Sequence, residues 1–268
     1  MKRSYYLLLS ILISIVILSQ ENVESIFVEY KYISSDVKEA VPYPAILQYN
    51  GGKSLFTIQF SKVGDDYETL MKQIESDTCK ICQNNKMIVL KGIDQKYFRN
   101  ENNEFILERA SGGKFIYAKD SVNLSWELGN KKDTILGFPC QNAFTEIRGR
   151  KYEVFYTQQI PLPLGPWKLY GLPGMILKAQ PLYYKKYSFE ATAVVLNPSK
   201  ELVLINDYTK IPEKDILTWE EFEKTLVERK LNKQKSIISN EKDQNVSITF
   251  SANEGLDGEY KKLQKEEN

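Results

Sequence analysis

The chain has 268 residues with 36 basic and 35 acidic side chains, so its formal net charge is only +1 at pH 7. This balance gives no strong long-range field and argues against nucleic acid as a partner. The sequence contains no histidine, which excludes Ser-His-Asp and Cys-His catalysis and histidine-bearing zinc sites within the chain. Carboxylate pairs, Ser-Lys pairs and thiols remain available for chemistry.

The first residues have the pattern of a secretory signal. Lys2 and Arg3 precede an apolar run from Tyr5 to Leu18, which is too short for a comfortable membrane span. We therefore expect residues 1–20 to be a cleaved signal peptide and the protein to be exported to the periplasm or cell envelope, or secreted. Residues 21–250 are expected to form a single β-rich domain, followed by a charged, disordered tail at 251–268.

Short alternating segments rich in aromatic and β-branched residues follow one another along the domain. Asn50-Gly51-Gly52 predicts a hairpin turn between two of them, and Phe189, Ala191, Ala193 and Val195 are predicted to share one face of a late strand. We predict a single curved antiparallel sheet, or a partly open barrel, in a mainly β protein. A short helix is predicted at 67–75. The expected strands are 25–33, 45–49, 54–60, 87–90, 105–108, 115–117, 124–128, 134–138, 140–147, 152–158, 175–177, 187–196 and 246–250.

The pattern changes after Asn197-Pro198. Thr218-Trp219-Glu220-Glu221 forms a capping box, in which the Thr218 hydroxyl and the Glu221 carboxylate bond reciprocally to the backbone, and it predicts a helix over about 218–232. We expect this amphipathic helix to lie on the sheet or across the mouth of a barrel. Peripheral contact with a membrane surface, through the basic residues at 229–230 and 233–235, is the alternative. The apolar stripe consists of Trp219, Phe222, Leu226, Val227 and Leu231.

Prolines and glycines are concentrated in residues 148–177. Ile160-Pro161-Leu162-Pro163 ends a predicted strand, because proline donates no backbone hydrogen bond. The structural motif Gly171, Leu172, Pro173 and Gly174 predicts a type II turn, with Gly174 at the position that requires a positive φ.

This region resembles the signature of the GLPGLI family of exported Bacteroidetes proteins. The segment Gly171-Leu172-Pro173-Gly174-Met175-Ile176 carries it, with Met175 in place of the usual leucine. The resemblance is strong over residues 126–177 and loose in the N-terminal half. It implies an exported protein, and it carries no activity over to this chain. The matching flanks are Gly137-Phe138-Pro139-Cys140-Gln141-Asn142-Ala143, Arg148-Gly149-Arg150, Tyr156-Thr157, Ile160-Pro161 and Gly165-Pro166-Trp167-Lys168.

Two sets of candidate binding residues fall in the same region. The first set is apolar and would provide anchors for an outer-membrane partner if rigid turns expose it; it consists of Leu162, Leu164, Trp167 and Leu172. The second set is cationic and would form an anion site if the strands bring its members together; it consists of Arg148, Arg150 and Lys168. A purely structural role is the alternative for both sets.

The cysteines indicate a disulfide before any redox or metal site. Cys79-Lys80-Ile81-Cys82 has the C-x-x-C spacing, but its neighbours are typical of a loop rather than of a helix N-terminus. In an oxidising compartment we expect Cys79 and Cys82 to form a loop disulfide. Cys140 is then either a small buried residue or the partner of one of the other two. We expect no cofactor and no metal.

Three hypotheses about function follow. The first is a noncatalytic binding or carrier protein that holds an apolar ligand or a peptide in the curved sheet. The second is an accessory protein that docks on an outer-membrane partner through the loops at 160–177. An enzyme, such as a hydrolase without histidine, comes third, because no nucleophile–base pair is identifiable. The carboxylates Asp65, Asp66 and Glu68 are typical of a solvated turn, and Glu220 and Glu221 of a helix N-terminus.

Overall fold

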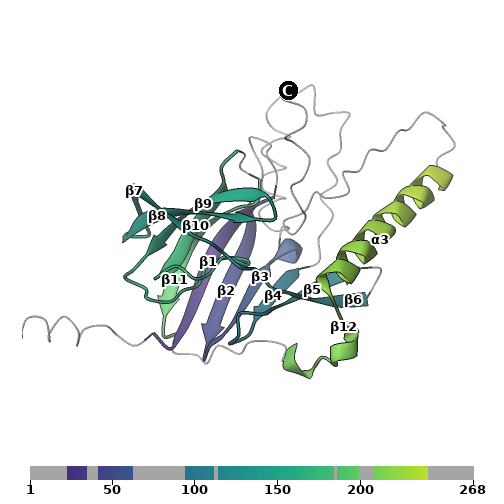
Figure 1. The fold of residues 1–268 in the computed structure, drawn as a ribbon, viewed down its shortest axis with the longest axis horizontal. Helices are drawn as coiled ribbons and strands as arrows, with labels where there is room; N and C mark the ends of the chain where they lie inside the picture. Colours follow the sequence, from purple (N-terminus) through teal and green to yellow (C-terminus); the bar gives the residue numbers. More distant parts are fainter. Residues whose placement is uncertain are drawn as a thin grey trace, which may run out of the picture.

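The computed structural model describes residues 23–34, 42–62, 94–111, 114–183, 186–198 and 208–240. Most of them lie in strands, which confirms the predicted mainly β fold class (Figure 1). The strands are β1 Ser25–Ile33, β2 Tyr43–Asn50, β3 Lys53–Ile58, β4 Gln95–Arg99, β5 Phe105–Ser111, β6 Lys114–Asp120, β7 Glu127–Ile135, β8 Phe138–Ile147, β9 Arg150–Thr157, β10 Met175–Pro181, β11 Ser188–Leu196 and β12 Ile216–Leu217. The helix α3 spans Trp219–Asn240, and single 3-10 turns span Phe60–Lys62, Tyr208–Lys210 and Glu213–Asp215.

All twelve strands belong to one sheet with the order β12-β6-β5-β4-β3-β2-β1-β11-β10-β9-β8-β7. The short strand β12 runs parallel to β6, and every other neighbouring pair is antiparallel. The sheet does not close into a barrel, because β7 and β12 each have only one neighbouring strand within the described part of the chain. Of the two predicted forms, the open curved sheet is the one observed.

Three hairpins share the same two-residue turn. Gly51-Gly52, Leu136-Gly137 and Arg148-Gly149 all have positive φ at both residues, with values between 48° and 83°, as in type I′ turns that match the twist of the flanking strands. The hairpin predicted at Asn50-Gly51-Gly52 is therefore confirmed. Leu136 and Arg148 are unusual at such positions, because a side chain at positive φ is sterically disfavoured. Contacts elsewhere must hold the Arg148 turn in place.

Two bulges change what the sequence pattern predicted. The expected strands at 124–128 and 134–138 are replaced by a single strand, β7, whose register shifts between Leu128 and Lys132. Gly129 sits inside this bulge, where an added Cβ would lie 2.1 Å from Asn142 Oδ1.

In β11, Ala193 pairs with Glu29 while Ala191 pairs with Tyr30, so Thr192 is an extra residue. The prediction that Val195 shares the face of Phe189 is wrong, because a bulge reverses the alternation.

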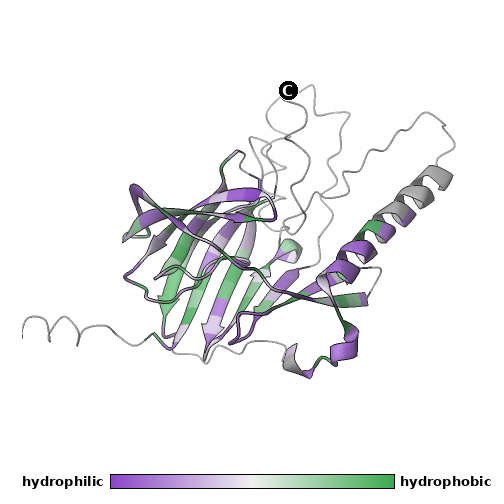
Figure 2. Ribbon diagram, in the orientation of Figure 1, coloured by the Kyte–Doolittle hydropathy of each residue, from purple (hydrophilic) through white to green (hydrophobic). Residues whose placement is uncertain are grey.

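One face of the sheet carries the main hydrophobic core. Tyr30, Tyr32, Phe56 and Phe189 pack there in contacts such as the stacked pair Tyr32–Phe189, with ring centroids 4.9 Å apart. Residues between Ile160 and Ile176 belong to the same core. Figure 2 shows hydrophobic and hydrophilic residues alternating along the central strands, whereas α3 is mostly hydrophilic. The alternation that predicted strands is therefore the alternation between core and outer face.

Helix α3 begins with the predicted capping box. The Thr218 N–H donates to Glu221 Oε2 at 2.9 Å, and the Glu221 N–H donates to Thr218 Oγ1 at 3.3 Å. Phe222 is buried, and Trp219 and Leu226 pack against the core, so the helix covers the β6–β12 edge rather than a barrel mouth (Figure 1). It ends at Asn240, beyond the predicted end. Within the described chain, no helix is long and apolar enough to cross a membrane.

Several predictions lie outside the described residues. They are the signal peptide at 1–20, the helix at 67–75, the strands at 87–90 and 246–250, the carboxylates Asp65, Asp66 and Glu68, the pair Cys79 and Cys82, and the tail at 251–268. The basic side chains at 229–230 and 233–235 also lie outside the described set, so the membrane-surface alternative stays a prediction.

Candidate functional site

The segment that was predicted to dock on a partner is buried in the core. Leu164, Trp167 and Leu172 are 2%, 3% and 2% exposed, and Leu162 is partly buried against the same core. Hot-spot anchors must be exposed in the free protein to bind a partner. The docking interpretation is therefore wrong for Leu164, Trp167 and Leu172, because they fill the core face of the protein's own sheet, and Leu162 is partly covered by the same core.

Short local bonds fold this segment onto the sheet. The N–H groups of Leu162 and Leu164 donate to the carbonyls of Ile160 and Leu162, at 2.8 and 2.7 Å. Met175 N–H then donates to Ile160 O at 3.0 Å and Ile176 N–H to Leu164 O at 2.8 Å, which returns the chain to strand β10. Buried backbone groups need such partners. The prolines interrupt the ladder and let the chain bond to itself while it crosses the core face.

The Gly-Leu-Pro-Gly motif is a tight turn, but not the predicted one. Gly174 N–H donates to Leu172 O at 2.7 Å across a three-residue turn, and the positive φ, 95°, belongs to Gly171 instead. A Cβ at Gly174 would lie 2.1 Å from Thr157 O. The glycine is required there because two backbone segments touch, and the assignment of a type II turn with positive φ at Gly174 is wrong.

Two of the three predicted cationic residues meet at a buried carboxylate. Arg148 Nη2 donates to Asp120 Oδ1 at 2.7 Å, and Lys168 Nζ lies 2.6 Å from Asp120 Oδ2, an ion-pair distance without the angle of a hydrogen bond. The side chains of Lys168, Asp120 and Arg148 are 0%, 3% and 17% exposed. We call these three residues, with Trp219, the Asp120 cluster.

Trp219 of helix α3 covers the two cations. Its ring lies 3.7 Å from Arg148 Cζ and 4.4 Å from Lys168 Nζ, both within the range of cation–π attraction. The Asp120 cluster thereby joins the end of β6, the β8–β9 turn, the segment 160–174 and the start of α3. It also supplies the contacts that hold Arg148 at positive φ.

Arg150 does not join this cluster. Its guanidinium lies 4.3 Å from the ring centre of Tyr187, and Nη1 donates to the Tyr152 hydroxyl at 3.4 Å. The predicted anion site of Arg148, Arg150 and Lys168 therefore does not form as one site. Arg148 and Lys168 do converge, but an internal carboxylate already occupies the position between them. This supports the structural alternative for the cationic set.

A second buried carboxylate, Glu153, ties the bulge of β7 to the sheet. It accepts from Lys131 Nζ at 2.9 Å and from Asn142 Nδ2 at 2.8 Å, and Asn142 Oδ1 accepts from the Lys131 N–H at 2.9 Å. Burial acts to raise the pKa of Glu153, but hydrogen bonds from Lys131, Asn142 and Gln180 together hold that pKa below its ordinary value. Specific side-chain hydrogen bonds therefore stabilise the bulge, so it is a defined part of the fold rather than a defect in the strand.

Glu153 should give stability that depends on pH in a defined direction. Because its pKa is lower in the folded chain, the contribution is fully present above its unfolded pKa of about 4.3 and is lost as pH falls through the folded value. We expect Glu153→Gln to be less stable than the parent at neutral pH, with a difference that shrinks in acid. Urea unfolding from pH 7 down to pH ~3 measures this. Lys132→Met, which leaves Glu153 untouched, serves as control, and a difference that widens in acid would contradict the assignment.

Cys140 is buried and is a free thiol among the described cysteines. Its Sγ donates to Phe138 O at 3.3 Å, and burial raises the pKa of Cys140 to about 11. Little reactive thiolate is then present at neutral pH, and the buried free thiol agrees with the small buried residue rather than with the partner of Cys79 or Cys82. Within the described ranges, no group of three or more Cys, Asp or Glu side chains could hold a metal ion.

Sequence reasoning missed Asp120, Glu153 and Trp219 as organising residues. Asp120 lies 28 residues from Arg148 in the sequence, and no local spacing connects it with Lys168 or with α3. The only available signal is that a carboxylate ends a strand whose middle is apolar. That signal is too common to single out one carboxylate.

These features define a class of protein: an open, mainly antiparallel β-sheet protein with a motif-bearing segment buried in its core. No family model matches the chain, and no curated protein matches it either. Two solved structures of PNGF-II, in space groups P21 and C2, are similar at 16% and 18% identity, with TM-scores of 0.45 and 0.44. The matches cover 73% and 72% of this chain but only 31% and 30% of those chains. Similarity at this level carries no argument about function.

Proposed function

We propose that this protein is an exported, noncatalytic binding protein of the cell envelope, of the GLPGLI type, that binds an extended peptide along strand β7. One observation carries the proposal: β7 is a nine-residue strand at the end of the sheet with one neighbouring strand among the described residues. An edge strand of this kind presents unpaired backbone donors and acceptors, and an added strand can bond to them.

The exposure of β7 favours such pairing. All its residues are exposed or partly exposed except Ile135. Leu128 within the strand and Leu136 in the following turn are 58% and 46% exposed, and they lie close to its two ends. Alternate side chains of an added peptide could contact these leucines while its backbone extends the sheet.

The direction of the β7 backbone groups identifies Thr134 as an outward-facing residue. Ile135 and Phe138 flank a two-residue turn and pair directly, so the N–H and C=O of Ile135 bond to β8. The N–H and C=O of the preceding residue, Thr134, therefore point away from β8, toward the free edge of the sheet. In agreement, the Thr134 N–H donates to its neighbour Asp133 at Oδ1, 2.7 Å away. A peptide that adds to this edge would accept from the Thr134 N–H in place of Asp133.

The charges of β7 limit which peptides could bind. Lys131, Lys132 and Asp133 lie on the exposed strand, and the bulge interrupts the ladder between Leu128 and Lys132. Natural edge strands use such charges and bulges to prevent indiscriminate pairing. A matching partner would therefore be a specific peptide rather than any exposed strand. By contrast, an apolar ligand inside the sheet has less support, because Leu164, Trp167 and Leu172 occupy the core face.

Proline at Thr134 tests this proposal. Thr134→Pro removes an outward-facing donor without removing a ladder bond to β8, and Thr134→Val keeps the donor as a matched control. We expect a displayed library of random peptides, selected on the parent protein, to yield sequences that still bind Thr134→Val but lose at least about tenfold in affinity for Thr134→Pro. Equal binding to both folded variants, or no enrichment on the parent, would refute a β7 site.

A further inference from the structure

Arg99 is a buried cation that donates its hydrogen bonds to two neutral side chains. It lies on β4 and is 6% exposed. Its Nε donates to Ser54 Oγ at 3.2 Å, and its Nη1 donates to Asn103 Oδ1 at 3.1 Å. The Tyr170 ring centre lies 5.5 Å from its Cζ. The two cations of the Asp120 cluster differ in this respect, since Arg148 and Lys168 both pair with Asp120.

Burial without a carboxylate is unfavourable for a guanidinium. Within the described chain, no carboxylate oxygen lies within 4.0 Å of the Arg99 guanidinium nitrogens. Loss of solvent lowers the pKa of Arg99, which reflects the same cost, and charge interaction with the phenolic groups of Tyr49 and Tyr170 opposes that effect. Buried charges in proteins are ordinarily paired. A negatively charged group at this position would therefore offset a cost that the described residues leave in place.

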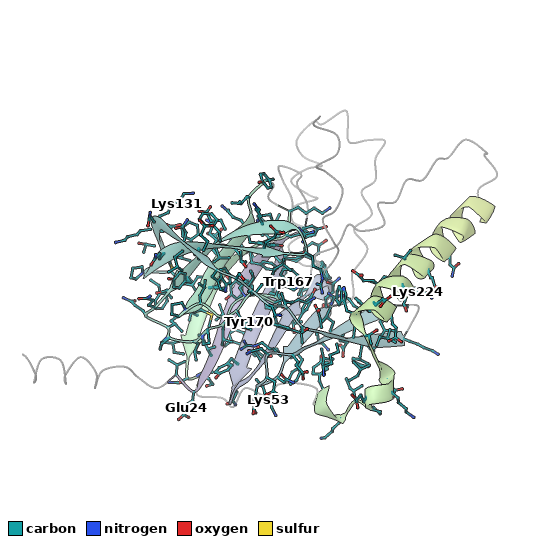
Figure 3. All side chains as sticks on the ribbon, in the orientation of Figure 1. Glu24, Lys53, Lys131, Trp167, Tyr170 and Lys224 are labelled. Atoms are coloured by element: carbon teal, nitrogen blue, oxygen red, sulfur yellow. The ribbon has the colours of Figure 1, made fainter. Side chains whose placement is uncertain are left out.

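Arg99 lies at one end of the core face, close to two exposed turns of the chain. Tyr49, Ser54, Arg99 and Phe105 are directly opposite one another on strands β2 to β5, so their side chains form a row on one face. The row lies beside the Gly51-Gly52 turn and the exposed loop that contains Asn103. Tyr49 and Tyr170 are only partly buried. In the view of Figure 3, Tyr170 lies nearer than Trp167 to the end of the sheet marked by Lys53.

We propose that Arg99 is the centre of a binding site for an oxyanion, namely a carboxylate or phosphate group of a small molecule. The guanidinium has further N–H donors beyond the two that bond to Ser54 and Asn103. Ser54 Oγ accepts from Arg99, so its own proton can donate to the same oxyanion. Tyr49 and Tyr170 would border the ligand. This site is separate from β7 and does not depend on the peptide proposal.

Asn103→Asp tests the site with a nearly isosteric change. The new carboxylate would lie where Asn103 Oδ1 now accepts from Arg99, and it would occupy the guanidinium in place of a ligand. Asn103 is exposed and has φ 61°, a conformation that aspartate tolerates. We expect Asn103→Asp to unfold at higher temperature than the parent in chloride and to bind oxyanions at least about tenfold more weakly. Asn102→Asp, in the same exposed loop, adds the same charge and should behave like the parent.

The measurement compares sodium phosphate and sodium acetate with sodium chloride at equal ionic strength, by thermal unfolding and by titration calorimetry. Phosphate stabilises many proteins by exclusion from their surface, so only a difference between Asn103→Asp and Asn102→Asp counts. Acetate that stabilises Asn102→Asp more than Asn103→Asp assigns a carboxylate ligand, and such a difference in phosphate alone assigns a phosphate ligand. Arg99→Gln should abolish either response. Equal responses of Asn103→Asp, Asn102→Asp and the parent, or no response of the parent, would overturn the proposal.

Discussion

Replacing Asp120 by asparagine is expected to lower the free energy of unfolding by about 3–5 kcal/mol, because it removes the carboxylate of a buried ion cluster while both cations stay in place. Arg148 and Lys168 lie 2.7 and 2.6 Å from its two oxygens, and the Lys168 side chain is fully buried. Asparagine has nearly the same shape, so the effect reports charge rather than packing. Such a loss is a large fraction of the stability of an ordinary domain.

Urea unfolding of Asp120→Asn against the parent measures this effect. The control is Glu104→Gln, which removes one partner of the exposed pair with Lys119, 2.7 Å apart, and should change stability little. A double variant, Asp120→Asn with Lys168→Met, should recover part of the loss because it removes a buried cation together with its counter-charge. If Asp120→Asn and Glu104→Gln proved equally mild, the cluster would not be a source of stability.

The second large effect is expected from Gly174→Ala, with a loss of about 3 kcal/mol or more. The methyl group would lie 2.1 Å from the Thr157 carbonyl oxygen and 3.1 Å from Gln158 Cα. Both neighbours are backbone atoms, so no side-chain rotation relieves the contact. The turn after β9 and the start of β10 would have to separate, and the segment that fills the core face would lose its anchor.

Gly137→Ala is the matched control for this substitution. Gly137 has φ 83°, but an added Cβ there would meet nothing within 4 Å. It should therefore cost only the backbone term of about 1–2 kcal/mol for a left-handed residue. Guanidinium unfolding of both variants separates backbone conformation from close contact. A loss for Gly174→Ala no larger than that for Gly137→Ala would show that the motif glycine has room, against the observed geometry.

The Asp120 cluster explains how an open sheet can keep a fixed curvature. Neighbouring strands fix the sheet only pairwise, whereas the cluster connects β6 with the β8–β9 turn, although β6 and β9 stand far apart in the strand order. Trp219 adds the helix to the same contact. The turn at Arg148 has an unfavourable φ of 48°, and the ion pair and the indole ring offset that strain. The curvature thus rests on a few charged contacts as well as on apolar packing.

The sequence by itself determined the local elements of this protein. Alternation of apolar and polar residues predicted β1 at its observed bounds, the Gly-Gly hairpin followed from its turn chemistry, and the Thr218–Glu221 capping box set the start of α3. These features depend on residues that lie within a few positions of one another. Local rules of backbone geometry and hydrogen bonding are sufficient for them.

Only the tertiary structure decided which side chains are exposed and which charges meet. Leu164, Trp167 and Leu172 have the composition of a docking surface, yet they are buried because the chain returns across its own sheet. Asp120, Arg99 and Gly174 owe their roles to partners brought close by strand register and by chain crossing. The amino-acid sequence does not give the distance in the folded protein between segments that are far apart along the chain. Burial, pairing of charges and close backbone contact therefore had to come from the folded sheet, whose shape depends on all strands together.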